Sequence, residues 1–381
     1  MRVRIWDVVV IGAGVAGGLA ALVCARQGLS VLVVDKRAFP RWKVCGCCFN
    51  AQAQGVLEAV GQGDLMARCG AQPLERLRIG FHGESAALSL PGGWVLSRER
   101  FDPALLEAAA AAGASVRFQT RGQLGPACSA TRCVRLTSSA GGPEDVVQAR
   151  VVLVAAGLVN HCSPEHSSVA THSESRVGAG CVLPATAHGY AGNAIHMALG
   201  HGGYVGLVQR EDGALNLAAA FDRSHLAASG GAAGAARSVL VSAGFDLPSD
   251  LMAGHWQLTP ALTRRPPAVA GNRCFLIGDA AGYVEPFTGE GMAWALTAGA
   301  AVAPLVVEGL GHWSPGLERR WLQTLQSLVV RRQRVCRALA TVLQSPLLTF
   351  GLFSLCRAWP GLPERIVRRV NRVQLPSAEI G

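Results

Sequence analysis

The chain has 381 residues, of which 50% are hydrophobic, so it can form a sizeable core and exceeds one ordinary domain. Its 35 basic and 25 acidic residues favour anionic membranes, cofactors or carriers as partners. Nucleic acid is not an expected partner, because only 6% of residues are aromatic and they are not interleaved with the basic ones. We expect a cytoplasmic protein, because the first residues run into a strand without an export signal and twelve cysteines suit free thiols.

A glycine-rich turn follows the first predicted strand. The apolar run 7–11 precedes glycines spread over 12–17, where a helix is predicted to start, and a second strand over 31–35 ends on an acid. Such a turn lets the backbone approach a pyrophosphate, and the acid is placed to accept hydrogen bonds from an adenosine ribose. We therefore expect a dinucleotide to contact Gly12, Gly14, Val15, Ala16, Gly17, Asp35 and Lys36.

A second glycine-rich segment lies some 260 residues downstream. The apolar run 274–277 predicts a short strand, and the stretch 285–296 is the glycine-rich start of a helix. An acid directly after the strand can bond a ribityl hydroxyl, and the helix start can offer N–H groups to the pyrimidine edge of a flavin. A nicotinamide dinucleotide would not require this second site, so FAD is the predicted cofactor. The residues expected to contact it here are Gly278, Asp279, Pro286, Gly289, Gly291 and Met292.

The middle of the chain predicts strands from two sheets. Residues 103–112 predict a helix that stops at Gly113, and 115–157 predict strands that return to the nucleotide-binding sheet. Alternating, glycine-rich runs between 176 and 256 predict an antiparallel sheet. The predicted domain parts are FAD-binding at 1–75, 101–175 and 266–310, substrate sheet at 76–100 and 176–265, and C-terminal helices at 311–381.

Three segments together resemble the FAD-dependent superfamily of para-hydroxybenzoate hydroxylase, flavin-dependent halogenases and geranylgeranyl reductases. They are the two glycine-rich segments and residues 97–105, which are similar to the family's Arg-x-x-(Phe/Leu)-Asp helix start. The resemblance implies that Arg98 reaches the FAD. It also implies a Rossmann-like, three-layer α/β fold, with an interleaved antiparallel sheet that roofs the substrate pocket over the flavin.

Two departures from the family pattern bear on the reaction. Many hydroxylases of the superfamily carry an Asp-Gly pair where residues 155–157 read Ala-Ala-Gly, so NAD(P)H and a partner reductase both stay open as electron donors. Halogenases carry a Gly-Trp-x-Trp-x-Ile-Pro run, and the corresponding stretch 203–209 lacks both tryptophans. Halogenation is therefore not expected.

The loop 39–50 carries three cysteines. Its Lys43-Val-Cys45-Gly46 run resembles an element of geranylgeranyl reductases, which implies that Cys45 and Gly46 line the isoalloxazine. The Cys-x-x-Cys spacing of Cys45 and Cys48 suits a reversible disulfide or an electron relay, provided that nearby basic residues stabilise a thiolate. We predict both as catalytic; the alternative is that the thiols pack under a flat cofactor. No metal site is predicted, because no second ligand pair has matching spacing.

Histidines and one tyrosine offer further candidates. His196 and Tyr204 lie on predicted roof strands, where they either contact substrate or occupy ordinary sheet positions. The remaining histidines fit polar loops better than a metal site; they include His161, His166, His172, His188 and His201.

The C-terminal residues 338–356 contain no charge and are flanked by arginines. Pro346 and Gly351 argue against a spanning helix. Two interpretations stay open: a helical lid packed on the catalytic domain, and an apolar helix pair lying in a membrane surface.

The sequence leaves the reaction open, because reduced flavin can pass a hydride to an activated alkene or react with O2 to hydroxylate an electron-rich ring. The superfamily is dominated by monooxygenases, so we expect hydroxylation of an apolar or phenolic secondary metabolite or lipid. The alternatives are a reductase of isoprenoid or fatty-chain double bonds and an electron-transfer or maturation partner of another protein.

Overall fold

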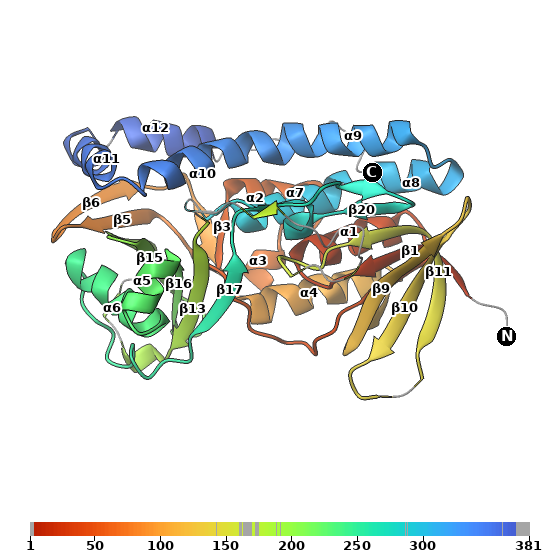
Figure 1. The fold of residues 1–381 in the computed structure, drawn as a ribbon, viewed down its shortest axis with the longest axis horizontal. Helices are drawn as coiled ribbons and strands as arrows, with labels where there is room; N and C mark the ends of the chain where they lie inside the picture. Colours follow the sequence, from red (N-terminus) through yellow and green to blue (C-terminus); the bar gives the residue numbers. More distant parts are fainter. Residues whose placement is uncertain are drawn as a thin grey trace.

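A computed structural model describes residues 4–141, 143–159, 162, 170–171, 175–187, 189–190, 192–285, 287, 289–359 and 361–370. Two large sheets lie side by side, and a long layer of C-terminal helices runs along the top of both (Figure 1).

The first sheet has eight strands with the order β19-β20-β11-β1-β2-β8, and β9 and β10 continue from β11. Strand β1 pairs in parallel with β2 and β11, and β11 pairs in parallel with β20. Both faces of the central strands are covered, so β1 and β2 read as almost uninterrupted valine, leucine and isoleucine. The strands are β1 (Ile5–Ile11), β2 (Val31–Val34), β8 (Ser115–Arg117), β9 (Thr120–Ala127), β10 (Arg132–Ser138), β11 (Asp145–Val154), β19 (Ala270–Gly271) and β20 (Cys274–Leu276).

Helices α1 (Val15–Arg26), α4 (Arg98–Ala111), α7 (Gly291–Ala301) and α8 (Ala303–Gly311) cover one face of this sheet. Small residues let them approach closely: a Cβ on Gly299 of α7 would lie 2.6 Å from the Ala16 carbonyl oxygen of α1. The stretch 291–311 is long and apolar enough to cross a membrane, but 78% of its apolar window is buried inside the molecule. It is therefore a core element of this fold.

Helix α4 starts earlier than the sequence predicts. It begins at Arg98, whereas the expected start is Pro103, which the structure places inside the helix. Proline lacks only the bond to the Glu99 carbonyl, near the helix start, so the helix continues through it. The predicted stop is confirmed, because Gly113 follows the last turn with a positive φ of 106°.

The second sheet has seven strands with the order β17-β13-β16-β15-β14-β5-β6. All neighbours are antiparallel except β14 and β5, so the early hairpin β5–β6 extends a sheet built from a later part of the chain. Helices α5 (Arg223–Ala228) and α6 (Ala232–Ser242) pack on its outer face. The strands are β5 (Arg76–Phe81), β6 (Glu84–Ser89), β13 (Val177–Leu183), β14 (Ala194–Gly200), β15 (Gly203–Gln209), β16 (Leu215–Phe221) and β17 (Gln257–Ala261).

Shorter elements connect the two sheets. Strands β3 (Cys48–Asn50), β4 (Gln72–Pro73) and β7 (Gly93–Val95) form a third, three-stranded sheet, and β12 (Ala170–Thr171) pairs with β18 (Arg264–Arg265). Helices α2 (Ala51–Ala59) and α3 (Leu65–Arg68) follow β3.

The C-terminal layer consists of α9 (Pro315–Leu325), a π-helical turn at Gln326–Val330, α10 (Arg331–Val342), α11 (Pro346–Ala358) and α12 (Gly361–Val370). Buried polar contacts anchor it to both sheets. Trp321 donates from its indole nitrogen to the Leu276 carbonyl at 3.0 Å, and Arg176 of the second sheet donates to the Leu343 carbonyl at 3.2 Å.

Candidate functional site

A cavity of about 910 Å³ lies between the two sheets and the C-terminal helices. It brings together both glycine-rich segments, the cysteine loop and the start of α4, which are far apart in sequence. The predicted site residues that line it are Gly12, Gly14, Val15, Ala16, Asp35, Lys36, Cys45, Gly46, Cys48, Arg98, Tyr204, Gly278, Asp279, Gly289, Gly291 and Met292.

In the glycine turn, some glycines are required for close backbone packing and others face the cavity. A Cβ on Gly12 would lie 2.3 Å from the Ala155 carbonyl oxygen, and one on Gly17 would lie 1.9 Å from the Gly12 carbonyl oxygen. Gly17 therefore serves close packing and does not line the cavity. At Gly14 the first obstacle is the Arg98 guanidinium, at 3.3 Å. No side chain caps α1, so its first N–H groups are left for an anion, as a pyrophosphate requires.

Asp35 is held more firmly than the sequence indicates. Its carboxylate accepts hydrogen bonds from the backbone N–H groups of Ala13 and Arg37, both at 2.9 Å, and lies 3.6 Å from the Arg41 guanidinium. It therefore ties the glycine turn to the end of β2 and also lines the cavity.

Basic side chains gather around this end of the cavity. Arg41 and Lys43 lie close to the two acids, and the Lys43 ammonium is 3.5 Å from the Asp279 carboxylate. Burial lowers the pKa of Arg41, and the neighbouring Asp35 opposes that shift. The basic residues that line the cavity outnumber these two acids, which suits the two phosphates of a dinucleotide; they are Lys36, Arg37, Arg41, Lys43, Arg98 and Arg121.

Arg98 is the first residue of α4 and is 5% exposed. Two hydrogen bonds of 2.7 Å to Asp102, one turn later, hold its guanidinium in a fixed fork. The fork fixes the orientation of the group toward the glycine turn, so an arginine and an aspartate four residues apart provide a rigid cation at the cavity wall.

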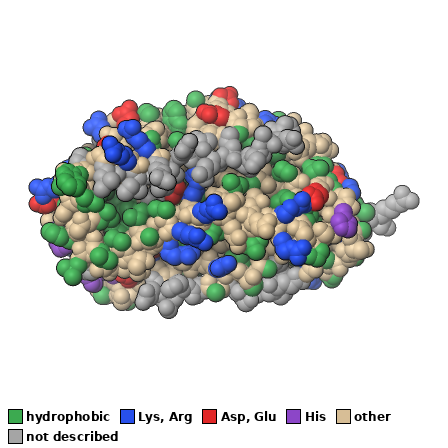
Figure 2. Space-filling view, turned by 90° about the horizontal axis from the view of Figure 1, so that it is seen from above, with side chains coloured by type: hydrophobic (Ala, Val, Ile, Leu, Met, Phe, Trp, Pro, Cys, Tyr) green, Lys and Arg blue, Asp and Glu red, His purple; other side chains and the backbone are tan. Residues whose placement is uncertain are grey.

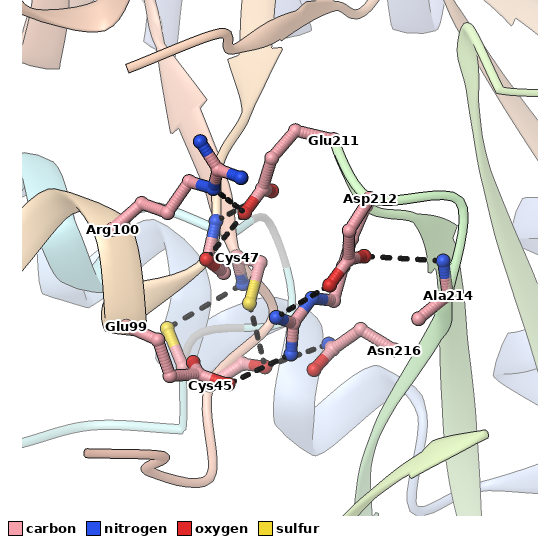
Figure 3. A network of polar contacts seen from close by, with 10 residues as sticks. Cys45, Cys47, Glu99, Arg100, Glu211, Asp212, Ala214 and Asn216 are labelled. Carbon is pink, nitrogen blue, oxygen red and sulfur yellow. Dashed lines mark hydrogen bonds and ion pairs between the residues drawn. The ribbon is translucent and has the colours of Figure 1, made fainter. Parts of the chain in front are cut away.

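The cysteine loop pairs Cys45 with Cys47, whereas the sequence suggests Cys48. Cys47 has a left-handed backbone, with φ of 57°, which turns its N–H to the Cys45 sulfur at 3.4 Å and its thiol to the Cys45 carbonyl at 3.8 Å (Figure 3). Cys48 instead donates its thiol to the Gly46 carbonyl at 3.1 Å. None of the twelve cysteines, all of which lie in the described residues, forms a disulfide.

The thiols of the loop differ in acidity. A hydrogen bond from the Cys47 side chain lowers the pKa of Cys45 to about 6. Burial opposes this shift, and the nearby Arg98 and Lys43 add to it. The same hydrogen bond and burial raise the pKa of Cys47, and burial raises that of Cys48. These shifts favour the thiolate form at Cys45 and the protonated form at its two neighbours. Sequence reasoning missed the part played by Cys47.

A polar network holds the loop and the start of α4 against the second sheet (Figure 3). Arg210, directly after β15, donates to Glu99 at 2.9 Å and to Asp212 at 3.0 Å. Glu211 accepts from the backbone N–H of Ser97 at 3.0 Å, and Asn216 donates to the Cys45 carbonyl at 2.9 Å. No motif marks these residues, because they meet only in the folded chain.

Tyr204 forms part of the cavity wall. It is 7% exposed and its ring meets that of Phe287 edge to face, with the ring centroids 5.0 Å apart. Its hydroxyl interacts with the buried carboxyl of Glu285, which Arg176 holds at 3.2 Å. Burial and Glu285 raise the pKa of Tyr204, and burial raises that of Glu285. A protonated phenol therefore faces the cavity at neutral pH.

His196 lies on the opposite face of the sheet, which agrees with an ordinary sheet position and not with contact with the substrate. Its ring packs edge to face against Tyr190, at 4.9 Å between centroids, and near Phe245. Its strand neighbours Ile195 and Met197 line the cavity instead, as the alternation of a strand requires.

Several other candidates lie elsewhere. Pro286 and the histidines at 161, 166, 172 and 188 lie outside the described residues. His201 lies near His225, with ring centroids 6.3 Å apart, and is not among the residues that line the cavity. Within the described part of the chain, no group of three or more His, Cys, Asp or Glu side chains is arranged to hold a metal ion.

Known proteins resemble this chain in sequence. Residues 6–177 match the family described as FAD binding domain. The menaquinone reductase of Mycobacterium tuberculosis is 28% identical over 374 residues, which cover 89% of this chain and 84% of that protein. The digeranylgeranylglycerophospholipid reductase of Methanosarcina acetivorans is 40% identical over 123 residues, 31% of this chain and 29% of that protein.

Solved structures share the fold at low identity. A flavoprotein/dehydrogenase from Cytophaga hutchinsonii has a TM-score of 0.78 at 18% identity and covers 97% of this chain and 93% of its own. The p-nitrophenol 4-monooxygenase from Pseudomonas putida has a TM-score of 0.75 at 14% identity and covers 97% and 99%.

The glycine turn, the uncapped start of α7 and the basic cavity wall fit FAD, and the matched family is defined by that cofactor. The chain is an FAD-dependent oxidoreductase: its residues 6–177 match an FAD binding domain, and it shares its fold with flavin-dependent enzymes.

Proposed function

We propose that this protein is an FAD-dependent reductase that adds two hydrogen atoms to a carbon–carbon double bond in the isoprenoid chain of a lipid or quinone. The observation that carries the proposal is the composition of the cavity beyond the flavin-contacting residues. There it becomes an apolar chamber between the second sheet and the C-terminal helices, with walls that include Leu77, Ile79, Leu88, Met197, Leu339 and Leu352.

An isoprenoid chain fits such a chamber because it has no polar group that needs a partner, and its burial is favourable in proportion to its apolar area. A phenol would require a hydrogen-bond partner for its hydroxyl beside the flavin. The sequence alone favours hydroxylation only through the frequency of that reaction in the superfamily. The apolar walls favour reduction instead.

The sequence relatives support this choice. The relative with the wide coverage reported above is named a menaquinone reductase, and the higher identity over a shorter segment belongs to a digeranylgeranylglycerophospholipid reductase. The structural neighbour named a monooxygenase shares only the fold at 14% identity. These names support a reductase over a monooxygenase as the proposed activity.

When bound, FAD would supply the hydride. The chain positions the reactants, excludes water and supplies a proton. The glycine turn, Asp35 and Arg98 would hold the dinucleotide, and the Lys43–Gly46 loop, which also lines the cavity, would lie beside its reacting ring. The chamber walls exclude water, which protects a reduced cofactor from side reactions. We assign the proton to the Tyr204 hydroxyl, because it stays protonated at neutral pH and Glu285 lies behind it to restore the proton.

The test mixes the photoreduced holoprotein, without oxygen, with a menaquinone whose chain is unsaturated. A menaquinone analogue with a fully saturated chain is the matched control. Re-oxidation of the flavin, followed by its absorbance, is expected only with the unsaturated chain. Equal rates with both would show electron transfer to the quinone ring and reject the proposal. Re-oxidation by neither quinone, nor by a digeranylgeranyl lipid, would reject the substrate class as well.

A further inference from the structure

We propose that helix α11, together with the basic residues around it, docks this protein onto an anionic lipid bilayer. The helix has two distinct faces, because one side packs on the protein and the other projects from it. This surface lies at the end of the C-terminal layer that extends over the hairpin β5–β6 (Figure 1).

The outward face is unusually apolar. Leu347 is 85% exposed, Phe350 is 61% exposed and Trp359, just past the helix end, is 69% exposed. Among the large hydrophobic side chains of the described residues, these three are the most exposed, and Leu348 adds a fourth at 55%. Such a cluster marks an interaction surface, since single scattered hydrophobic residues would need no explanation.

The inward face is already occupied, so the helix cannot turn to bury these residues. Phe353 is buried against Phe81, with ring centroids 5.6 Å apart, and Thr349 is buried with bonds to the carbonyls of Val342 and Ser345. The outward side chains therefore need a partner outside this chain.

Charge identifies that partner. Residues 331–370 carry eight arginines and a single acid, Glu364, which already accepts a hydrogen bond from the Ser89 backbone. Arg334, Arg337, Arg365 and Arg368 are exposed. Figure 2 looks down on this layer and shows hydrophobic side chains, several Lys or Arg side chains and a few Asp or Glu side chains toward its α11 end. Apolar side chains bordered by cations match the anionic surface of a bilayer.

Two alternatives are disfavoured. A second copy of the chain would bring mostly arginines against arginines, because the nearby acids Glu84 and Glu364 already bind Arg357 and the Ser89 backbone, so a symmetric dimer through this face is disfavoured. A spanning helix needs about 20 residues, whereas α11 has 13 and bends by 111° from the helix before it. The helix would therefore lie in the plane of the bilayer interface.

Docking through α11 would also place the cavity beside the lipid. Leu352 and Cys356 of α11 line the cavity, while Leu347 and Phe350 of the same helix face outward. If the proposed function holds, an isoprenoid chain passes from the bilayer along α11 without crossing water. The docking itself does not depend on the reaction.

The test is flotation of the holoprotein with vesicles of phosphatidylcholine and phosphatidylglycerol in equal parts, and with vesicles of phosphatidylcholine alone. We expect binding to the mixed vesicles, and a loss of at least tenfold in the pair of substitutions Leu347→Ser and Phe350→Ser. The matched control pair is Val241→Ser and Met252→Ser, which are similarly exposed at 57% and 60% but lie in or after α6. The control should bind as the unmodified protein does.

A charge variant tests whether the arginines near α11 contribute to binding. Each arginine near an anionic surface contributes about fivefold in affinity, so Arg365→Gln with Arg368→Gln should weaken binding to the mixed vesicles about 30-fold. Unchanged FAD content and melting temperature show that the variants are folded. The proposal is overturned if the protein does not float with mixed vesicles, if both serine pairs lose binding equally, or if light scattering shows a dimer that only the α11 pair dissociates. None of these readouts involves turnover, so they leave the proposed reaction to its own test.

Discussion

The contact between Cys45 and Cys47 leads to a quantitative prediction for the pKa of Cys45. At pH 7 a thiol with a pKa of about 6 is about 90% ionised, whereas an ordinary thiol with a pKa of about 8.5 is about 3% ionised. The side chain of Cys47 is the largest cause of the lowered pKa of Cys45, and burial opposes it. Cys47→Ala removes that side-chain hydrogen bond but keeps burial and the backbone N–H of Cys47, so the pKa of Cys45 should rise toward the ordinary value despite Arg98, Lys43 and the backbone bond.

The assay is alkylation with iodoacetamide between pH 4.5 and 9.5, followed by mass spectrometry of the peptide that contains Cys45. The pH of half-maximal rate should lie near 6 in the unmodified protein and move toward 8.5 in Cys47→Ala. The midpoint is more informative than the rate at one pH, because a more basic thiolate is also a better nucleophile. The alkylated cysteine has to be identified from its peptide, because Cys128 also reacts at low pH. Hydrogen bonds from Thr131 lower the pKa of this exposed thiol to about 7.

Cys48→Ala is the control for this experiment. Its thiol bonds the Gly46 carbonyl, so its loss should leave the Cys45 midpoint in place. A midpoint at or above pH 8 in the unmodified protein, or one that moves equally in both variants, would refute the reasoning. The thiolate also links stability to pH: the lowered pKa of Cys45 stabilises the fold fully above about pH 8.5. That stabilisation is lost as the pH falls to about 6.

Three further predictions concern the cofactor and the reaction. Gly14→Val directs a branched side chain at the Arg98 guanidinium and into the cavity, so the purified protein should lose most of its yellow colour. The control Gly28→Ala, at an open turn, should keep the colour. If Gly14→Val has the FAD content of the unmodified protein, the assignment of the glycine turn to FAD is wrong. Tyr204→Phe should keep FAD and lower turnover by at least 100-fold, as expected for a lost general acid, and unchanged turnover would remove Tyr204 from the mechanism. Because residues 155–157 lack the Asp-Gly pair, NADH and NADPH should each reduce the flavin slowly without substrate or a partner reductase, and rapid bleaching by either one alone rejects this inference.

The sequence predicts the nucleotide-binding half of this protein well, because its signals are local. A glycine that needs positive φ or a close backbone approach cannot be replaced, so Gly12 and Gly17 report the turn directly. The acid after each strand is equally local. The hydrogen bonds of Asp35 to backbone N–H groups could not be predicted, because every residue except proline carries such a group.

The rest of the site depends on register and tertiary contact. A shift of one residue moves a strand side chain to the other face, and this separates His196 from its cavity-lining neighbours. The Cys-x-x-Cys spacing suggests Cys48, but the left-handed backbone at Cys47 brings that residue to Cys45 instead. The Glu285–Tyr204 contact joins segments some 80 positions apart and leaves no local pattern.

The most direct test of the proposed reaction is the mass of the product. The photoreduced holoprotein is given one equivalent of a menaquinone with an unsaturated chain, without oxygen, and the product is re-oxidised in air before fragmentation by mass spectrometry. Air returns a reduced quinone ring to the quinone but leaves a reduced chain unchanged. We predict a gain of two hydrogen atoms located in the isoprenoid chain. A product with the starting mass would show that only the ring accepts electrons, and one that gains an oxygen atom when O2 is admitted to the reaction would show a monooxygenase; either result contradicts the account.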